Sequence, residues 1–168
     1  MITTIEEFYT ESVKYINEFN LFAKKHKLLG LTKADHICYK CGSKESFESL
    51  RTLFDNNSEY IYQSIISKRR ISYIKLKQRI STVLGEIHFV ELSDQKPDQS
   101  QSDSFDHIEV YGVSISYDEL VATLAQSENV IKVERPHHTT HDVEIKDGFL
   151  FRCTQEPLIK KIKREEMK

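Results

Sequence analysis

A short phrase that contains a common metal-ligating residue occurs twice in this chain of 168 residues. Residues 35–37 and 106–108 both read Asp-His-Ile, and each opens a stretch in which apolar and polar residues alternate. Alternation predicts a β-strand, and a repeated phrase suggests a repeated structural unit. If the two units pair with pseudo-symmetry, both imidazoles point into one shared cleft. The chemistry that this pattern predicts is the binding of a divalent metal ion, since imidazole is a frequent ligand.

Three cysteines suggest a second kind of chemistry, but their number and placement argue against it. Cys38 and Cys41 form a Cys-x-x-Cys pattern, and Cys153 is the third. An odd count makes a poor disulfide framework, and no second Cys-x-x-Cys follows at the spacing of a zinc site. Alternation along a strand also directs Cys38 and Cys41 to opposite faces. We therefore expect incidental or structural cysteines, reduced thiols and a cytoplasmic protein.

Several other side chains could contact a ligand. Arg69 and Lys75 share one face of a predicted strand. On a concave face they would flank an anionic substrate, and on a convex face they would be surface charges. Residues 136–141 form a loop rich in histidine and threonine, which is expected to be solvated. His141 begins the next strand and could reach the cleft mouth as a proton carrier.

The elements that must position these residues follow in a repeated order. Each unit reads as a strand, a helix and then three strands, the pattern of a curved mixed sheet in an α+β fold. We treat residues 1–168 as one domain. Its expected parts are an N-terminal helix over 3–29, a first βαβββ unit over 34–92, a linker over 93–104, a second βαβββ unit over 105–154 and a C-terminal helix over 156–168.

Three local signals support these boundaries. A capping box at Thr3 or Thr4 begins the first helix, and Ser116-x-x-Glu119 begins the helix of the second unit. Such a box forms because a hydroxyl and a carboxylate satisfy free backbone amides reciprocally. Asp147-Gly148 predicts a tight hairpin before the last strand, since glycine tolerates positive φ.

Composition excludes several classes of function. The net charge of −2 gives no sign of a nucleic-acid or membrane-surface binder. No apolar stretch approaches the roughly 20 residues that span a bilayer, and the N-terminus lacks the pattern of a secretory signal. We expect a monomer or homodimer whose partner is a small molecule.

Short phrases along the chain resemble a known family. They are Ala34–Ile37, Val90–Leu92, His107–Glu109, a weaker match around Arg69, Ile71 and Lys75-Leu76, and Asp147-Gly148. With the double βαβββ pattern, they resemble the vicinal oxygen chelate superfamily, which includes glyoxalase I and extradiol dioxygenases. The chain is more closely similar to the bacterial YecM family, whose members look like single vicinal-oxygen-chelate domains without an established reaction.

The resemblance implies a metal site built from the first and last strands of each unit. It assigns His36 and His107 to the first strands and Glu91 to the last strand of the first unit. Two imidazoles and one carboxylate would bind Fe, Mn, Ni or Zn and leave positions open for substrate or water. Arg152 departs from the family pattern at the fourth position. It would repel a cation or bind an anionic substrate, so a three-ligand site, or no catalytic metal, is favoured over a four-ligand one.

Neighbouring acidic residues have more than one interpretation. Glu109 shares a strand face with His107 and could be a ligand, a partner of a ligand or a general base; it could also form only a buried ion pair. Asp35 and Asp106 precede the two histidines and, by alternation, are expected to face away from the cleft.

Two main functions follow from the resemblance. The first is a small metal-dependent enzyme acting on an oxygen-bearing anionic substrate, with isomerase, lyase and dioxygenase chemistry all open. Glu109 and His141 are then the nearest candidates for proton transfer. The second is a non-catalytic module that binds a small anionic ligand on the same fold, because fold alone does not specify function. A scaffold that retains the histidine pair as a structural remnant is a third, weaker interpretation.

Overall fold

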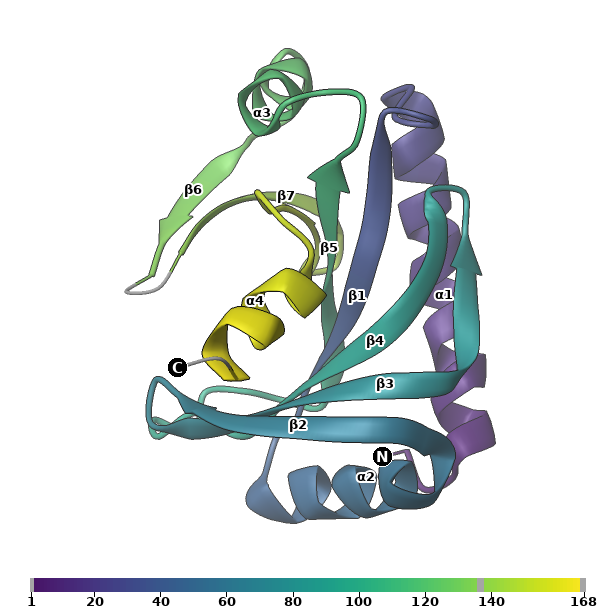
Figure 1. The fold of residues 1–168 in the computed structure, drawn as a ribbon, viewed down its shortest axis with the longest axis vertical. Coiled ribbons are helices and arrows are strands. Elements are labelled where there is room, and N and C mark those ends of the chain that lie inside the picture. The colour runs from purple at the N-terminus through teal and green to yellow at the C-terminus, as the bar shows by residue number, and fades with distance from the viewer. Residues whose placement is uncertain (1, 136–137, 167–168) are drawn as a thin grey trace.

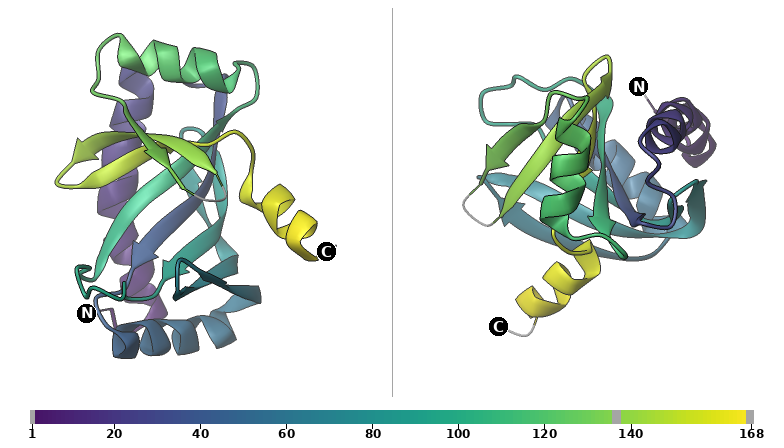
Figure 2. Two further views of the ribbon diagram at one scale, coloured as in Figure 1. Left: turned by 90° about the vertical axis from the view of Figure 1, so that its left-hand side faces the viewer. Right: turned by 90° about the horizontal axis from the view of Figure 1, so that it is seen from above.

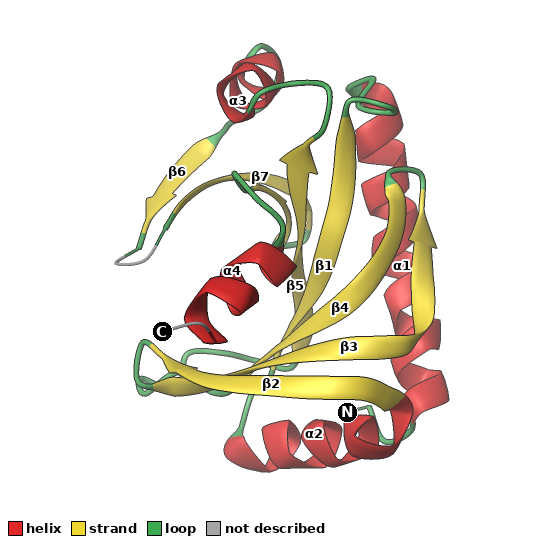
Figure 3. Ribbon diagram, viewed as in Figure 1, coloured by secondary structure: helices red, strands yellow, loops and turns green. Residues whose placement is uncertain are grey.

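The protein is described here by a computed structural model that covers residues 2–135 and 138–166. Strand, helix and three strands follow one another twice after a long first helix (Figures 1 and 3). The elements are α1 (Ile5–Lys25), β1 (Thr32–Lys40), α2 (Lys44–Asn57), β2 (Ser58–Ile66), β3 (Arg69–Thr82), β4 (Gly85–Ser93), β5 (Ser104–Gly112), α3 (Tyr117–Ala125), β6 (Ile131–Glu134), β7 (Thr139–Lys146), β8 (Phe149–Cys153) and α4 (Leu158–Glu166).

All eight strands belong to one sheet, in the order β2-β3-β4-β1-β5-β8-β7-β6. The first strands of the two units, β1 and β5, pair antiparallel at its centre. Each also pairs in parallel with the last strand of its own unit, β4 or β8. The sheet curves around a concave face (Figure 1). The predicted fold class, two βαβββ units in one curved mixed sheet with an extra N-terminal helix, is therefore confirmed.

The main core lies between the convex face of the sheet and α1, which runs behind it (Figure 2). Phe8 and Phe19 of α1 are fully buried. Phe8 meets the ring of Phe54 edge-on at a centroid distance of 5.0 Å, and Phe19 stacks on Phe151 at 5.6 Å. Aromatic rings in these geometries add to the stabilisation that burial itself provides. The helix thus anchors both units to one core.

The local signals of the sequence form as predicted. Thr4 and Glu7 make the capping box of α1, and Ser116 and Glu119 make that of α3. Residues 147–148 connect β7 to β8, and both have positive φ, as a two-residue hairpin turn requires. Within the described residues, none of the helices is both long and apolar enough to cross a membrane.

The last helix lies on the concave side, opposite to α1 (Figures 1 and 2). Leu158 and Ile162 of α4 are buried with Phe89 in a second, smaller apolar cluster. The backbone N–H of Leu158 donates to Oδ2 of Asp35 at 2.8 Å, which ties the start of α4 to the first strand. The C-terminal helix therefore forms one wall of the space inside the curved sheet.

Candidate metal centre

Two irregularities in the central strand pair bring each aspartate to its neighbouring histidine. The β1–β5 register shifts between Ala34 and His36 and again opposite Asp106, so Asp35 and Asp106 have no partner across the pair. An extra residue of this kind is a β-bulge, which interrupts the alternation of side chains. Oδ2 of Asp35 lies 2.8 Å from Nδ1 of His36, and Oδ2 of Asp106 lies 2.7 Å from Nδ1 of His107. The prediction that both aspartates face away from the site was wrong.

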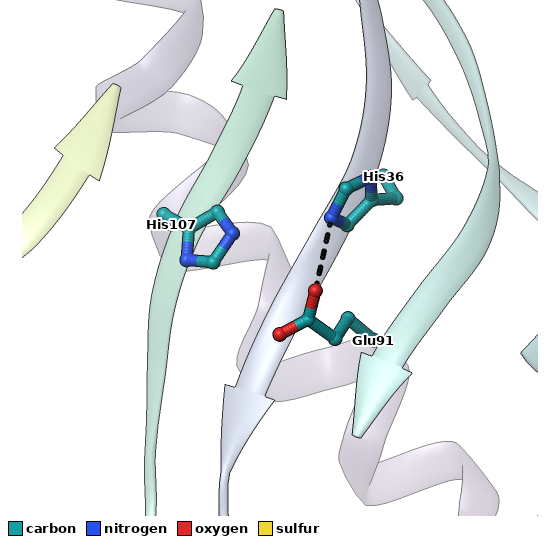
Figure 4. A group of neighbouring side chains, drawn as sticks. All are labelled: His36, Glu91 and His107. Carbon is teal, nitrogen blue, oxygen red and sulfur yellow. Dashed lines mark ion pairs between the residues drawn. The ribbon is translucent and has the colours of Figure 1, made fainter. Parts of the chain in front are cut away.

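The two histidines and Glu91 form a compact group of potential ligands (Figure 4). One ligand atom from each can be chosen so that all lie within 4.8 Å of one another. Nε2 of His36 is 3.5 Å from Oε2 of Glu91, and this buried nitrogen has no hydrogen-bond partner among the described residues. A buried polar atom without a partner is costly, so its position calls for a ligand.

Glu109 and Cys38 lie next to this group of potential ligands. In the β1–β5 register, His36 lies opposite Glu109, and His107 lies opposite Cys38. Oε1 of Glu109 is 4.0 Å from Nε2 of His107, whereas the thiol of Cys38 contacts Oε1 of Glu91 at 3.4 Å. Cys38 was not expected at the site. The signal was its place in the repeated phrase, where Asp-His-Ile is followed by Cys38 in one copy and Glu109 in the other.

Arg152 occupies the position that corresponds to Glu91 in the other half of the sheet. Glu91 pairs with Cys38, and Arg152 pairs with Glu109, at equivalent points of the two parallel strand pairs. The guanidinium is buried and binds both carboxylate oxygens of Asp142, at 2.9 Å and 2.7 Å. Its Nη1 is 2.9 Å and 3.0 Å from the ring nitrogens of His107. Arg152 is thus held by an internal ion pair and puts a positive charge beside the group.

The two imidazoles differ in their charge environment. Burial lowers the pKa of His36, but the carboxylates of Glu109, Asp35 and Glu91 outweigh it and raise that pKa to about 10. Burial and the charge of Arg152 together lower the pKa of His107, despite the hydrogen bond with Asp106. The site therefore favours positive charge on the His36 side, where the carboxylates converge.

A cavity of about 780 Å³ opens over this group on the concave face. His36, Glu91 and Glu109 line it from the sheet, while Lys161 lines it from α4 and Arg135 from the end of β6. Nζ of Lys161 is 3.0 Å from the hydroxyl of Thr154 and 3.5 Å from Oε2 of Glu109. The volume lies within the range of pockets that take small molecules.

The comparison with protein families decides the relationship of this chain. The model described as "YecM protein" matches residues 1–149. The chain belongs to the YecM family. The matched part includes His36, Glu91 and His107 and ends at the start of β8, before Arg152. No curated protein was found to match this YecM chain.

Solved structures resemble this YecM chain to different extents. The structure of a protein named EC4020 aligns over 98% of both chains, with a TM-score of 0.74 and 18% sequence identity. Methylmalonyl-CoA epimerase of Streptomyces coelicolor, in complex with 2-nitronate-propionyl-CoA, gives a TM-score of 0.46 at 14% identity over 74% of this chain and 96% of that one. A methylmalonyl-CoA epimerase in complex with methylmalonyl-CoA and NH4+ gives 0.47 at 14% identity over 76% and 99%. The first likeness shows a shared fold, and none of the three tells us about ligand or reaction.

Four of the residues predicted to bind or act on substrate are not part of the cavity lining: Arg152, described above, and Arg69, Lys75 and His141. Arg69 contacts the backbone oxygen of Asp94 and the side chain of Gln101, and Lys75 pairs with Glu59 at 2.6 Å. Nδ1 of His141 is 2.6 Å from the hydroxyl of Tyr117. It follows Thr140 and precedes Asp142 on β7, and alternation directs it away from the face where Asp142 meets Arg152. Of the predicted histidine-rich loop, His137 lies outside the described residues.

The residues present in this YecM chain fit a divalent metal ion. Imidazole nitrogen and carboxylate oxygen are the donors that Fe, Mn, Ni and Zn accept. Nη1 of Arg152 lies 3.0 Å from Nε2 of His107. The aspartates engage Nδ1 of both histidines, and a carboxylate behind the ring is the usual arrangement at metal-bound histidines. The unpartnered Nε2 of His36 agrees with this. Arg152 places a positive charge, not a fourth donor, at the position that corresponds to Glu91.

Proposed function

We propose that this YecM protein binds a divalent metal ion through His36, Glu91 and His107, and a small oxygen-bearing anionic molecule in the cavity above them. The observation that carries the proposal is the pair of Asp–His contacts made by the two bulges. Two bulges at matching places in β1 and β5 orient two imidazoles towards one carboxylate. A purely structural core would not need this, because apolar residues fill such a space at lower cost.

Each residue at the site would have a distinct task in such a protein. A bound ion would supply polarisation of a ligand oxygen. Glu109 lines the cavity beside His107 and is the nearest group that could accept a proton from the ligand. The cavity wall formed by α4 would exclude water from the bound molecule. We propose isomerase, lyase or dioxygenase chemistry as the reaction class, with Glu109 rather than His141 in the proton-transfer role.

Elemental analysis tests the metal site directly. The protein should be purified without an affinity tag or chelator, and its content of Fe, Mn, Ni and Zn measured by mass spectrometry. We expect a stoichiometric amount of one of these ions. After removal of the ion, adding it back at about 100 times its Kd should stabilise the fold by about 2.7 kcal/mol, seen as a higher Tm. Negligible metal in the purified protein, together with no rise in Tm with any of the four ions, would contradict the proposal.

Replacing Asp106→Asn is expected to weaken the affinity for the metal by about 10- to 100-fold. The amide cannot supply the negative charge that orients His107 and makes its other nitrogen a stronger ligand. Competition with a chromophoric chelator measures the affinity. Asp106 also pairs with Lys40, so Lys40→Met is the matched control that removes this pair and keeps the carboxylate. An effect of Asp106→Asn no larger than that of Lys40→Met would show that the aspartate serves only the ion pair with Lys40.

A further inference from the structure

Arg135 is a half-buried cation in the cavity wall that forms no direct ion pair with the residues the structure describes. Its Nη1 donates to the hydroxyl of Thr140 at 2.7 Å. Within the part of the chain that the structure describes, no carboxylate oxygen lies within 4 Å of its guanidinium. Burial and the nearby charge of Arg152 lower its pKa, although the more distant carboxylates of Asp142, Glu109 and Glu91 act in the opposite direction.

The other cations near the cavity are already satisfied. Arg152 is bound at two points by Asp142, and Lys161 contacts Thr154 and Glu109. Arg164, which also lines the cavity, pairs with Glu156. A guanidinium carries five N–H donors, and among the described side chains Arg135 has one acceptor for them, the hydroxyl of Thr140. Charges removed from water are normally paired, and an anion bound in the cavity would supply the partner that Arg135 lacks among the described residues.

The position of Arg135 determines what kind of partner it can take. It lines the same cavity as His36, Glu91 and Glu109, with Lys161 lining it from α4. A group bound to Arg135 would therefore share the cavity with the proposed metal centre. The planar fork of a guanidinium matches the two oxygens of a carboxylate or phosphate.

We propose that Arg135 is the recognition residue for an anionic oxygen group, carboxylate or phosphate, on the molecule that the cavity binds. This inference rests on the proposed function only in taking the cavity as the ligand site. Arg135 takes the anion-binding role that was predicted for Arg69, Lys75 and Arg152. Lys161 contributes a second positive charge, so the site discriminates against neutral ligands.

Titration with simple anions tests the proposal. Inorganic phosphate and succinate are added to the full-length protein as purified, with sodium chloride at equal ionic strength as reference, and binding is followed by calorimetry. We expect at least one probe to bind, and Arg135→Gln to weaken that binding by at least about tenfold. Which probe binds more tightly identifies the anion as phosphate or carboxylate. The affinity of Arg135→Lys, which keeps the charge but not the planar guanidinium, is expected to lie between those of the parent protein and Arg135→Gln.

The controls separate this inference from the metal proposal. Arg79→Gln removes an exposed arginine that pairs with Glu86 outside the cavity, and should leave anion binding unchanged. Arg135→Gln should keep the metal content of the parent protein, and anion binding should survive in His36→Ala. A protein that binds anions but no metal would contradict only the proposed function. Failure of both probes to bind, or equal binding by the parent, Arg135→Gln and Arg135→Lys, would overturn the role of Arg135.

Discussion

Replacing either His36 or His107 by alanine is expected to abolish stoichiometric metal binding. Each imidazole is one of only three protein ligands in the proposed site, and each is held by its own aspartate. Loss of a ligand should reduce affinity by more than the about 10- to 100-fold expected when a partner behind a ligand is lost. Elemental analysis of the purified variants, followed by titration with the native ion, measures the effect.

A matched control and a second variant keep this prediction falsifiable. His141→Ala removes a partly buried histidine that contacts Tyr117 and does not line the cavity, so its metal content should equal that of the parent protein. Removing His36 also takes one positive charge away from Glu91 and Glu109, which would lower stability. His36→Gln keeps a polar group of similar reach, and circular dichroism verifies its fold. If the folded variants of His36 and His107 retain stoichiometric metal, these residues are not the ligands.

Replacing Arg152→Met is expected to lower the free energy of unfolding by about 3–5 kcal/mol. The methionine fills much of the same space but leaves Asp142, which is buried, without its bidentate partner. The hydroxyl of Thr140, 3.2 Å from Oδ1 of Asp142, cannot neutralise that charge. Urea denaturation with comparison of midpoints and slopes measures the loss.

The double variant Arg152→Met with Asp142→Asn isolates the cause. Because the uncompensated charge is then gone, we expect it to be more stable than Arg152→Met alone, a coupling that a double-mutant cycle quantifies. The exposed pair of Arg79 and Glu86 provides the control, since Arg79→Met should change stability by no more than about 0.5 kcal/mol. A loss below about 1 kcal/mol for Arg152→Met would mean that water reaches and solvates Asp142.

Local patterns were sufficient to predict much of the fold. The capping boxes at Thr4 and Ser116 and the turn at residues 147–148 depend on neighbours within a few positions, and all three form. Strand alternation and helical spacing also gave the element order of each unit. The repeated Asp-His-Ile phrase led to His36 and His107, and the structure places their side chains close together, with ring centroids 5.8 Å apart.

Contacts between distant segments lay beyond such patterns. Arg135 and Lys161 enter one cavity only because the end of β6 and the helix α4 lie over the same concave face. Arg152 was predicted at the fourth ligand position. Its ion pair with Asp142 depends on how β7 pairs with β8. Arg69 and Lys75 were predicted to share one strand face and bind an anion, yet their partners lie outside the cavity.

Periodicity and turn chemistry act over short distances, so the order of elements in each unit and the histidine on each first strand could be predicted from the residues alone. The direction of Asp35 and Asp106 depends on how two distant strands pair. Strict alternation turns each aspartate away from its histidine, and only the mutual register of β1 and β5 makes each aspartate an extra residue. A bulge of this kind arises when two strands pair, so neither strand reveals it alone. Through that pairing, the histidines of the repeated tripeptide lie close to Glu91.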